Sequence, residues 1–510
     1  MLEGLTAALS FMVSNPLTFL LILFGMVWGI AFGALPGLTG VVAVALLIPF
    51  TFIFGPIEGL LLLGSVYVGA TFGGSISAIL FNTPGSPEAA CTGLDGYPMA
   101  KKGKAGEALG TALASSAIGG LFGTVVLMVM APPLARFALT FGPAEYFALA
   151  VVGITAIAAI GTTSVVKALI TGLLGLAIAT IGMDQLTGTA RYTFGANMLL
   201  SGVSFIPAII GMFALAEVLT RFSEPKVSGE RAPGERITSV STIVPRIGEI
   251  LMMKWTLLRS ATIGTVIGTL PGVGATTAAF ISYSEAVRWS KHPERFGTGV
   301  PEGIAAPEAA NNAAVGGSMV PLLALGIPGS ATTAIMIGGL TIHGIVPGPM
   351  MLVQNPALVY SVFIGMLIAN LIMIFVGLRA AKYFARIVDA PYALVGPAIV
   401  VLCATGVYAL RNNVMDLVVM LVFGALGFLL RRLDYPIAPL IIGLVLGPIA
   451  EINLRRALML DNFDIFAVIS RPITAGLLLF AAVSLAYGLY GQFKRQAEAR
   501  RRALADTGSG

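Results

Sequence analysis

The chain contains many apolar runs long enough to cross a lipid bilayer, and this feature limits its fold more than any other. Such runs recur from Leu17 to the region of residue 485. A run of about 18 or more apolar residues spans a hydrocarbon core about 30 Å thick. With 57% hydrophobic and only 11% charged residues, the composition is that of a membrane protein. We therefore predict an all-α, polytopic membrane protein with about 10–14 transmembrane segments.

Glycine and proline interrupt several of these apolar runs. One example is the stretch ALGIPGSATTAIMIGGL at residues 324–340. Proline lacks a backbone N–H group and glycine tolerates positive φ, so both residues can end a helix. Non-helical backbone at membrane depth is tolerated only where protein buries it or a wet cavity adjoins it. Helix ends at that depth expose backbone groups that can bind ions. We therefore predict broken or re-entrant helices around a polar cavity.

The breaks occur in two copies. GALPGLTG at residues 33–40 recurs as GTLPGVGA at residues 268–275, and GGSISAILFNTPGS at residues 73–86 recurs as GGSMVPLLALGIPGS at residues 316–330. The prolines of the second pair, Pro84 and Pro328, are 244 residues apart. This repetition predicts two homologous halves, 1–220 and 256–490. A charged cytoplasmic linker, 221–255, joins them, and a basic cytoplasmic tail, 491–510, follows.

The distribution of basic residues suggests that the two halves have opposite topology. Lys101, Lys102 and Lys104 follow the second break of the first half, whereas the matching loop PMMLVQNP of the second half has none. At the next turn the bias reverses, because the first half has only Arg136 and the second has Arg379, Lys382 and Arg386. Such reversal is expected of inverted repeats, with chance variation as the alternative. The same rule predicts a non-cytoplasmic N-terminus and a cytoplasmic C-terminus.

Uncharged hydrogen-bonding groups cluster beside the breaks and form the predicted site. For a single break, a helix kink with small packing residues would be the better interpretation. Four Pro-Gly breaks at corresponding places favour a site instead. The main candidates are Asn82, Thr83, Gly85 and Ser86 in the first half and Gly329, Ser330, Thr332 and Thr333 in the second. The candidates at the other pair of breaks are Gly37, Thr39, Gly272, Thr276 and Thr277.

Other polar residues within the apolar runs admit two interpretations. The amides of Asn311 and Asn312 either coordinate a cation or join helices by hydrogen bonds. Glu308, one turn before Asn312, is predicted to be solvated at a helix end rather than to complete a cation site. Solvated segment ends are likewise predicted, in preference to a proton relay, for Asp184, Glu217, Asp389, Asp416 and Glu451, and for Lys167 and Arg191.

The motifs resemble those of a known family. GALPGLTG, FNTPGSPEAACTGLDGYPM, PEAANNAAVGGSMVPLLALGIPGSATTAIMIGGL and HGIVPGPMM are similar to the large permease subunit, the TctA type, of the tripartite tricarboxylate transporters. The resemblance covers essentially the whole chain. It implies a small membrane subunit of the TctB type, a periplasmic binding protein of the TctC type, and a bacterial inner-membrane location. It also implies an elevator-type fold that imports citrate-like di- or tricarboxylates, with the substrate held at the Pro-Gly tips.

Charge arithmetic indicates ion coupling. No Lys or Arg lies within either Pro-Gly motif, so any anion there is expected to be held by helix ends and hydroxyl groups. An uncompensated charge at membrane depth costs at least about 2.5–3.5 kcal/mol, and helix N-termini supply only about half a positive charge each. A co-bound sodium ion, with Asn311 and Asn312 as candidate ligands, would supply the missing charge. The alternatives are a proton-coupled organic-anion transporter and an anion channel.

Several other classes of protein are disfavoured. Cys91 and Cys403 form no CxxC pair, and His292 and His343 have no partner at metal-ligand spacing, so a transition metal is not expected. The basic residues lie in short loops, which points to membrane orientation rather than nucleic-acid binding. Neither a phosphate-binding loop nor a nucleophile motif is present, so we expect no enzyme activity and no cofactor beyond the coupling ion.

Overall fold

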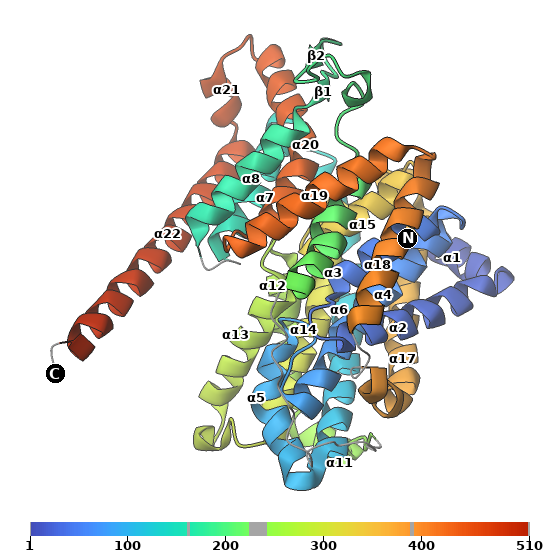
Figure 1. Cartoon of the computed structure of the whole chain (residues 1–510), viewed down its shortest axis with the longest axis vertical. Coiled ribbons are helices and arrows are strands. Elements are labelled where there is room, and N and C mark those ends of the chain that lie inside the picture. The colour runs from blue at the N-terminus through green and yellow to red at the C-terminus, as the bar shows by residue number, and fades with distance from the viewer. Residues whose placement is uncertain (1, 161–163, 224–241, 388–391, 508–510) are drawn as a thin grey trace. The chain divides into compact units, whose positions relative to one another are not determined.

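The computed structural model describes residues 2–160, 164–223, 242–387 and 392–507, and these are almost entirely helical (Figure 1). Within the described residues, nine helices are long and apolar enough to cross a membrane, and four shorter apolar helices accompany them. The prediction of an all-α, polytopic membrane protein is therefore confirmed. The only described strands are β1 (Gly182–Met183) and β2 (Ala190–Arg191), which pair antiparallel with Gly182 opposite Arg191. The inverted relation of the halves and the elevator movement remain predictions.

The chain forms two compact units, and each draws on both predicted halves. Unit 1 comprises residues 1–139, 206–270 and 274–429, and unit 2 comprises residues 140–205, 271–273 and 430–510. About half of the predicted linker, residues 224–241, falls outside the described residues, as does Asp389. The helices of unit 1 before the linker are α1 (Leu2–Ser14), α2 (Leu17–Ala34), α3 (Gly40–Thr51), α4 (Pro56–Phe81), α5 (Ala89–Met99), η1 (Ala100–Lys104), α6 (Ala105–Ala138), α9 (Phe205–Ile210), η3 (Gly211–Leu215) and α10 (Ala216–Ser223). Those after it are α11 (Ile247–Met252), α12 (Lys254–Thr269), α13 (Gly274–Trp289), η4 (Pro293–Arg295), α14 (Pro301–Leu325), α15 (Ala331–Ile342), α16 (Pro349–Gln354), α17 (Pro356–Ile387), α18 (Tyr392–Arg411) and α19 (Val414–Arg432).

The core of unit 1 is built from two long buried helices, α4 and α14. Helix α2 packs along α4, and α12 packs in the same way along α14. Small residues allow these pairs to approach closely, because a Cβ atom at Gly33 would overlap the backbone of Ala70 and one at Gly268 would crowd the carbonyl of Ala314. Glycine in a helix costs about 1 kcal/mol relative to alanine, but in membranes it permits the close contact that holds helices together.

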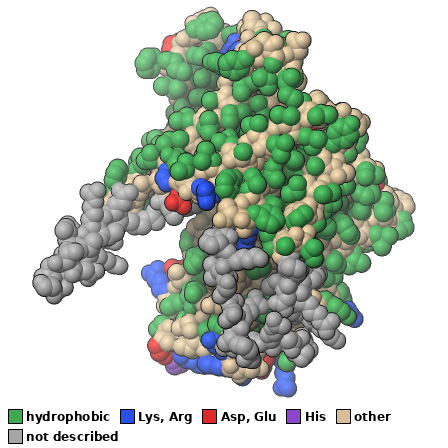
Figure 2. Space-filling view, viewed as in Figure 1, with side chains coloured by type: hydrophobic (Ala, Val, Ile, Leu, Met, Phe, Trp, Pro, Cys, Tyr) green, Lys and Arg blue, Asp and Glu red, His purple; other side chains and the backbone are tan. Residues whose placement is uncertain are grey.

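The short helices after the breaks pack on the opposite half of the sequence. Helix α5 follows the first-half break and lies against α13 and α14, whereas α15 follows the second-half break and lies against α3 and α4. The two halves are therefore interleaved within unit 1. In Figure 2 hydrophobic side chains are spread over the upper and middle part of the visible face, whereas charged side chains gather at its lower end.

Unit 2 has its own helical core and a charged end. Its helices are α7 (Pro143–Ile160), α8 (Val165–Ala179), η2 (Asn197–Leu199), α20 (Ala438–Leu460), α21 (Ile465–Ile469) and α22 (Pro472–Thr507). Helix α20 packs on α7 and α8, and α22 packs on α7. The buried carboxylate of Glu145 accepts a hydrogen bond from the Thr474 hydroxyl at 3.0 Å, which ties α7 to α22.

Candidate functional site

Helices α4 and α14 end with the same backbone geometry, 244 residues apart. At the first end, Asn82 adopts a left-handed conformation with φ of 53°, and the Thr83 amide donates to the Ser77 carbonyl at 3.4 Å. At the second end, Gly326 has φ of 76°, and the Ile327 amide donates to the Pro321 carbonyl at 3.2 Å. This pattern satisfies the last carbonyls of a helix and stops it sharply. Both apolar runs therefore end as broken helices.

The other pair of breaks also matches in backbone geometry. After α2, Leu35 has φ of −79° and ψ of 116°, and after α12, Leu270 has φ of −79° and ψ of 120°. Two residues later, Gly37 and Gly272 have φ of 85° and 77°. Positive φ is readily adopted only by glycine, so each Leu-Pro-Gly motif sets the same turn.

The second tip, residues 326–330, is buried and held by its own side chains. Ser330 begins α15: its hydroxyl accepts a hydrogen bond from the Thr333 amide at 3.2 Å, and its amide donates to the Thr333 hydroxyl at 2.8 Å. Thr332 is buried beside them. The hydroxyl of Tyr67, from α4 of the first half, lies 3.0 Å from that of Ser330 and 3.2 Å from that of Ser318. A first-half helix thus contacts the second-half tip.

The first tip, residues 82–88, is more open. Asn82 and Thr83 are exposed, whereas Gly85 and Ser86 are buried. The Gly85 amide donates to the Gly74 carbonyl at 3.2 Å, which folds the tip back onto α4. The buried Ser86 hydroxyl makes no hydrogen bond of good geometry in the described part of the chain, although the Glu88 carboxylate lies beside it. Such a group is costly unless something else pairs with it.

A carboxylate that the sequence analysis did not select lies at the end of the first tip. Glu88, half-buried at the end of the first tip, faces the hydroxyl groups of Ser86 and Thr276. It also lies close enough to Tyr67 to act on it electrostatically. The structure therefore gathers predicted residues from both halves around Tyr67 and Glu88. The tetrapeptide PEAA at Pro87 and again at Pro307 was a sequence signal for Glu88, but its two copies do not share the register of the repeat.

The remaining predicted site residues lie beside this cluster or apart from it. Gly329 is buried at the second tip, where a Cβ atom would crowd Ser318 and the Gly268 carbonyl. Thr39 precedes α3 without capping it, and Thr277 lies in the first turn of α13. Asn311 and Asn312 are buried in α14 and hydrogen-bond to Glu308 rather than to the tips.

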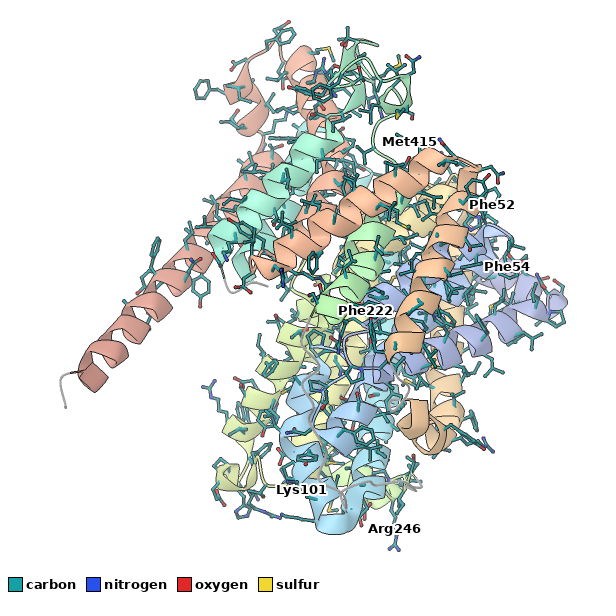
Figure 3. All side chains as sticks on the ribbon, viewed as in Figure 1. Phe52, Phe54, Lys101, Phe222, Arg246 and Met415 are labelled. Atoms are coloured by element: carbon teal, nitrogen blue, oxygen red, sulfur yellow. The ribbon has the colours of Figure 1, made fainter. Side chains whose placement is uncertain are left out.

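Arg221 adds a basic group to the helix ends and hydroxyl groups that were predicted to hold an anion. Its guanidinium lies directly over Gly37, so that a Cβ atom there would overlap it. The side chain also pairs with the carboxylate of Glu217 at 3.1 Å and lies over the Tyr392 ring. The neighbouring Phe222 is labelled in Figure 3. A positive charge therefore stands at the first Leu-Pro-Gly break, although it comes from residue 221 and not from the motif.

The prediction that Glu308 is solvated is wrong. Its side chain is completely buried in α14. Its carboxylate accepts hydrogen bonds from Ser75 at 2.5 Å, from Ser116 at 2.7 Å and from Thr92. These partners lie between 192 and 233 residues away in the sequence. Their distance explains why the local pattern, an acidic residue near a helix start, was misleading.

Most of the other intramembrane carboxylates are also paired rather than solvated. Asp184 is 6% exposed and bonds to Arg455 at 2.6 Å. Arg191 pairs with both Asp184 and Glu451. Asp416 is 2% exposed and bonds to Arg411 at 3.1 Å. Solvation was wrong for Asp184 and Asp416, which are buried against arginines. Glu451 and Arg191 are paired but keep 28% of their side-chain surface exposed. Lys167 is exposed and donates to the Leu433 carbonyl.

A separate cavity of about 650 Å³ lies in unit 1 at the end of α14 opposite the second tip. It is lined by charged side chains, including Lys104, Glu107, Arg246 and Glu302, and by Met99 and Met252. Lys101 and Arg246 mark this end in Figure 3. The 25 residues of α14 separate it from the second tip, a helix length of about 37 Å.

These features define a helical, multi-pass membrane protein whose helices break at corresponding places in both halves. The family described as the tripartite tricarboxylate transporter TctA family matches residues 19–442, and the chain belongs to it. The chain is 40% identical over 462 residues to an Agrobacterium vitis protein described as an uncharacterized 52.8 kDa protein in the TAR-I ttuC' 3' region. That match covers 91% of this chain and 90% of the relative.

A second Agrobacterium vitis protein, described as uncharacterized and in the TAR-II ttuC' 3' region, is 40% identical over 215 residues. The match covers 42% of this chain and 89% of that protein. No solved structure matches the chain. The family resemblance inferred from the Pro-Gly motifs is therefore confirmed.

Proposed function

We propose that this chain is the large permease subunit of a secondary active transporter that imports di- or tricarboxylates such as citrate. Membership of the tripartite tricarboxylate transporter TctA family supports this proposal. The observation that carries the site is the contact between Tyr67 of the first half and Ser330 at the second tip. It sits beside Glu88 and Ser86 of the first tip. Hydrogen-bonding groups of both halves thus meet at one place within unit 1.

The charges at the breaks bear on ion coupling. Arg221 beside Gly37 offers a guanidinium that can bind a carboxylate bidentately. Glu88 has the opposite effect, because its carboxylate would repel an anionic substrate at the tips. A co-bound cation would offset this repulsion. We therefore propose sodium coupling, with proton coupling as the alternative in which Glu88 or the substrate carries a proton.

The same proposal includes partners and a mechanism. A small membrane subunit and a periplasmic binding protein that delivers the carboxylate would complete the system in a bacterial inner membrane, with the N-terminus periplasmic and the C-terminus cytoplasmic. In an elevator mechanism, unit 1 would be the moving part, because it carries both tips. Neither enzyme activity nor a cofactor other than the coupling ion is needed for this cycle.

Uptake of labelled citrate into vesicles tests the proposal. The vesicles contain this chain and its two partners, with either a sodium or a proton gradient imposed. Saturable accumulation that follows the sodium gradient would support a sodium-coupled transporter. Accumulation that follows only the proton gradient would favour the alternative. Equilibration without accumulation would indicate a channel, and failure with a panel of di- and tricarboxylates would refute the proposed substrate class.

A further inference from the structure

Glu308 and the polar groups that surround its carboxylate form a buried centre, which is not part of the proposed substrate site. Its side chain has no exposed surface, and four donors surround the carboxyl group: the hydroxyls of Ser75, Thr92 and Ser116, and the Asn311 amide at 3.4 Å. No Lys, Arg or His among the described residues forms an ion pair with it. A buried carboxylate without a counter-charge is strongly unfavourable. The centre therefore requires a positive charge from outside the chain, either a proton or a metal cation.

Oxygen atoms dominate the surroundings of this carboxylate. Three hydroxyl oxygens lie within hydrogen-bonding distance of it. The side-chain oxygen of Asn312 is buried one turn away and has no partner in the described part of the chain. Carboxylate, hydroxyl and amide oxygens are the ligands that hard cations prefer. An unpartnered buried amide oxygen one helical turn from a buried carboxylate is the kind of group that a cation site requires.

The charge of the centre selects a monovalent ion. When it is ionised, Glu308 contributes one negative charge, and its hydrogen-bond partners Ser75, Thr92, Ser116 and Asn311 are neutral. A monovalent cation would make the buried centre neutral, whereas a divalent cation would leave a net charge at membrane depth, where charge is costly.

The centre is also placed to act on the first tip. Ser75 lies on α4 before the break and Thr92 lies on α5 after it, so Glu308 links both arms of this broken helix to α14. An ion bound here would hold the two arms together. Loss of the ion would leave the carboxylate uncompensated and would loosen the tip that carries Ser86.

We propose that Glu308, with the oxygens of Ser75, Thr92, Ser116 and Asn312, binds the sodium ion that is transported with the substrate. This inference rests on the proposed function and specifies its ion site. It differs from the prediction based on Asn311 and Asn312 alone, because the carboxylate supplies the charge and the first-half hydroxyls supply most of the ligands.

Equilibrium binding of ²²Na⁺ to the purified full-length chain in nanodiscs tests the site without substrate or partners. The wild type should bind sodium saturably. Glu308→Gln keeps the shape of the side chain and should raise the Kd for sodium about tenfold or more, because ligand charge governs cation affinity. Ser116→Ala removes one neutral oxygen and should raise the Kd less. Glu145→Gln in unit 2 alters another buried carboxylate and should leave the Kd for sodium unchanged.

The outcomes separate the site from the function. Unchanged sodium binding in folded Glu308→Gln, or in both Ser116→Ala and Ser75→Ala if Glu308→Gln fails to fold, would overturn the site. A second outcome would also overturn the sodium site: the wild type binds no sodium, and its thermal midpoint depends on pH while that of Glu308→Gln does not. That outcome would identify a proton as the occupant. If the site binds sodium but vesicles accumulate no carboxylate, the ion site stands and the proposed function fails. If carboxylate uptake follows the sodium gradient while Glu308→Gln binds sodium as tightly as the wild type, the proposed function stands and this ion site fails.

Discussion

The hydroxyl of Tyr67 lies 3.0 Å from the hydroxyl of Ser330, although 263 residues separate them in the sequence. This contact joins the long first-half helix α4 to the second-half tip. It also places Ser330, the residue that caps the N-terminus of α15, within a hydrogen-bond network that includes Ser318. The polar site therefore exists only when both halves fold together.

Replacing Tyr67 by Phe should weaken substrate binding while leaving the fold intact. The variant keeps the ring and removes two hydrogen bonds, each contributing about 0.5–1.5 kcal/mol. We expect a Kd for citrate about threefold to tenfold higher, measured on the purified chain. Tyr360→Phe, at another buried tyrosine of unit 1, is the matched control. Equal affinities for Tyr67→Phe and the control would show that the contact has no part in binding.

Ser86→Ala and Ser330→Ala should differ in stability but not in the direction of their effect on affinity. The Ser86 hydroxyl is buried and makes no hydrogen bond of good geometry within the described residues, so its removal should leave the thermal midpoint unchanged or raised. The Ser330 hydroxyl caps α15, and its loss should destabilise the protein by about 1 kcal/mol. Both variants should bind citrate more weakly. A large loss of stability in Ser86→Ala would contradict this account of the first tip.

Gly85→Ala should destabilise the first tip. A Cβ atom at this position would overlap the carbonyl oxygen of Gly33, and forced overpacking costs about 1–3 kcal/mol. The control is Gly476→Ala in α22, where a Cβ atom meets no other atom within 4 Å; alanine there should be neutral or slightly stabilising. The thermal midpoints of the two variants in detergent provide the comparison. A midpoint for Gly85→Ala as high as that of the control would mean that the two backbones are not in close contact.

The charge of Arg221 should matter more than that of other paired arginines. Arg221→Gln is expected to raise the Kd for citrate about tenfold or more, because hydrogen bonds to charged groups contribute about 1.5–3 kcal/mol. Arg221→Lys should raise the Kd for citrate less, because lysine keeps the positive charge but lacks the planar guanidinium group that binds a carboxylate bidentately. Arg411→Gln also removes an arginine paired with a carboxylate but leaves the Leu-Pro-Gly break untouched. An equal increase in the Kd for citrate in Arg221→Gln and Arg411→Gln would exclude a specific role for Arg221.

The contribution of Asp184 to stability should depend on pH. The Arg455 guanidinium and, secondarily, the Leu186 amide hold the pKa of this carboxyl well below its ordinary value. A lowered pKa in the folded state means that the stabilisation is complete above the unfolded value of about 3.9 and is lost as pH falls below it. The difference in thermal midpoint between wild type and Asp184→Asn should therefore be constant from about pH 8 to 5 and shrink towards pH 3. A difference that grows on acidification would contradict this sign.

Local patterns in the sequence predicted the breaks well. The Pro-Gly motifs end α4 and α14, because proline and glycine act on the backbone within a few residues. The 244-residue register even aligns Asn82 with Gly326, which share the left-handed conformation. The membrane class followed from hydropathy, which depends on composition within a single segment.

The sequence by itself thus determined the membrane class, the helical content and the positions of the broken helices, since each of these depends on neighbouring residues. Only the tertiary structure decided that Glu308 is buried among first-half hydroxyls, that Arg221 covers Gly37 and that Glu88 of the first tip faces Thr276 of the second half. The surroundings of a charged group depend on residues brought together from distant segments. Hydropathy and spacing along one helix do not contain that information.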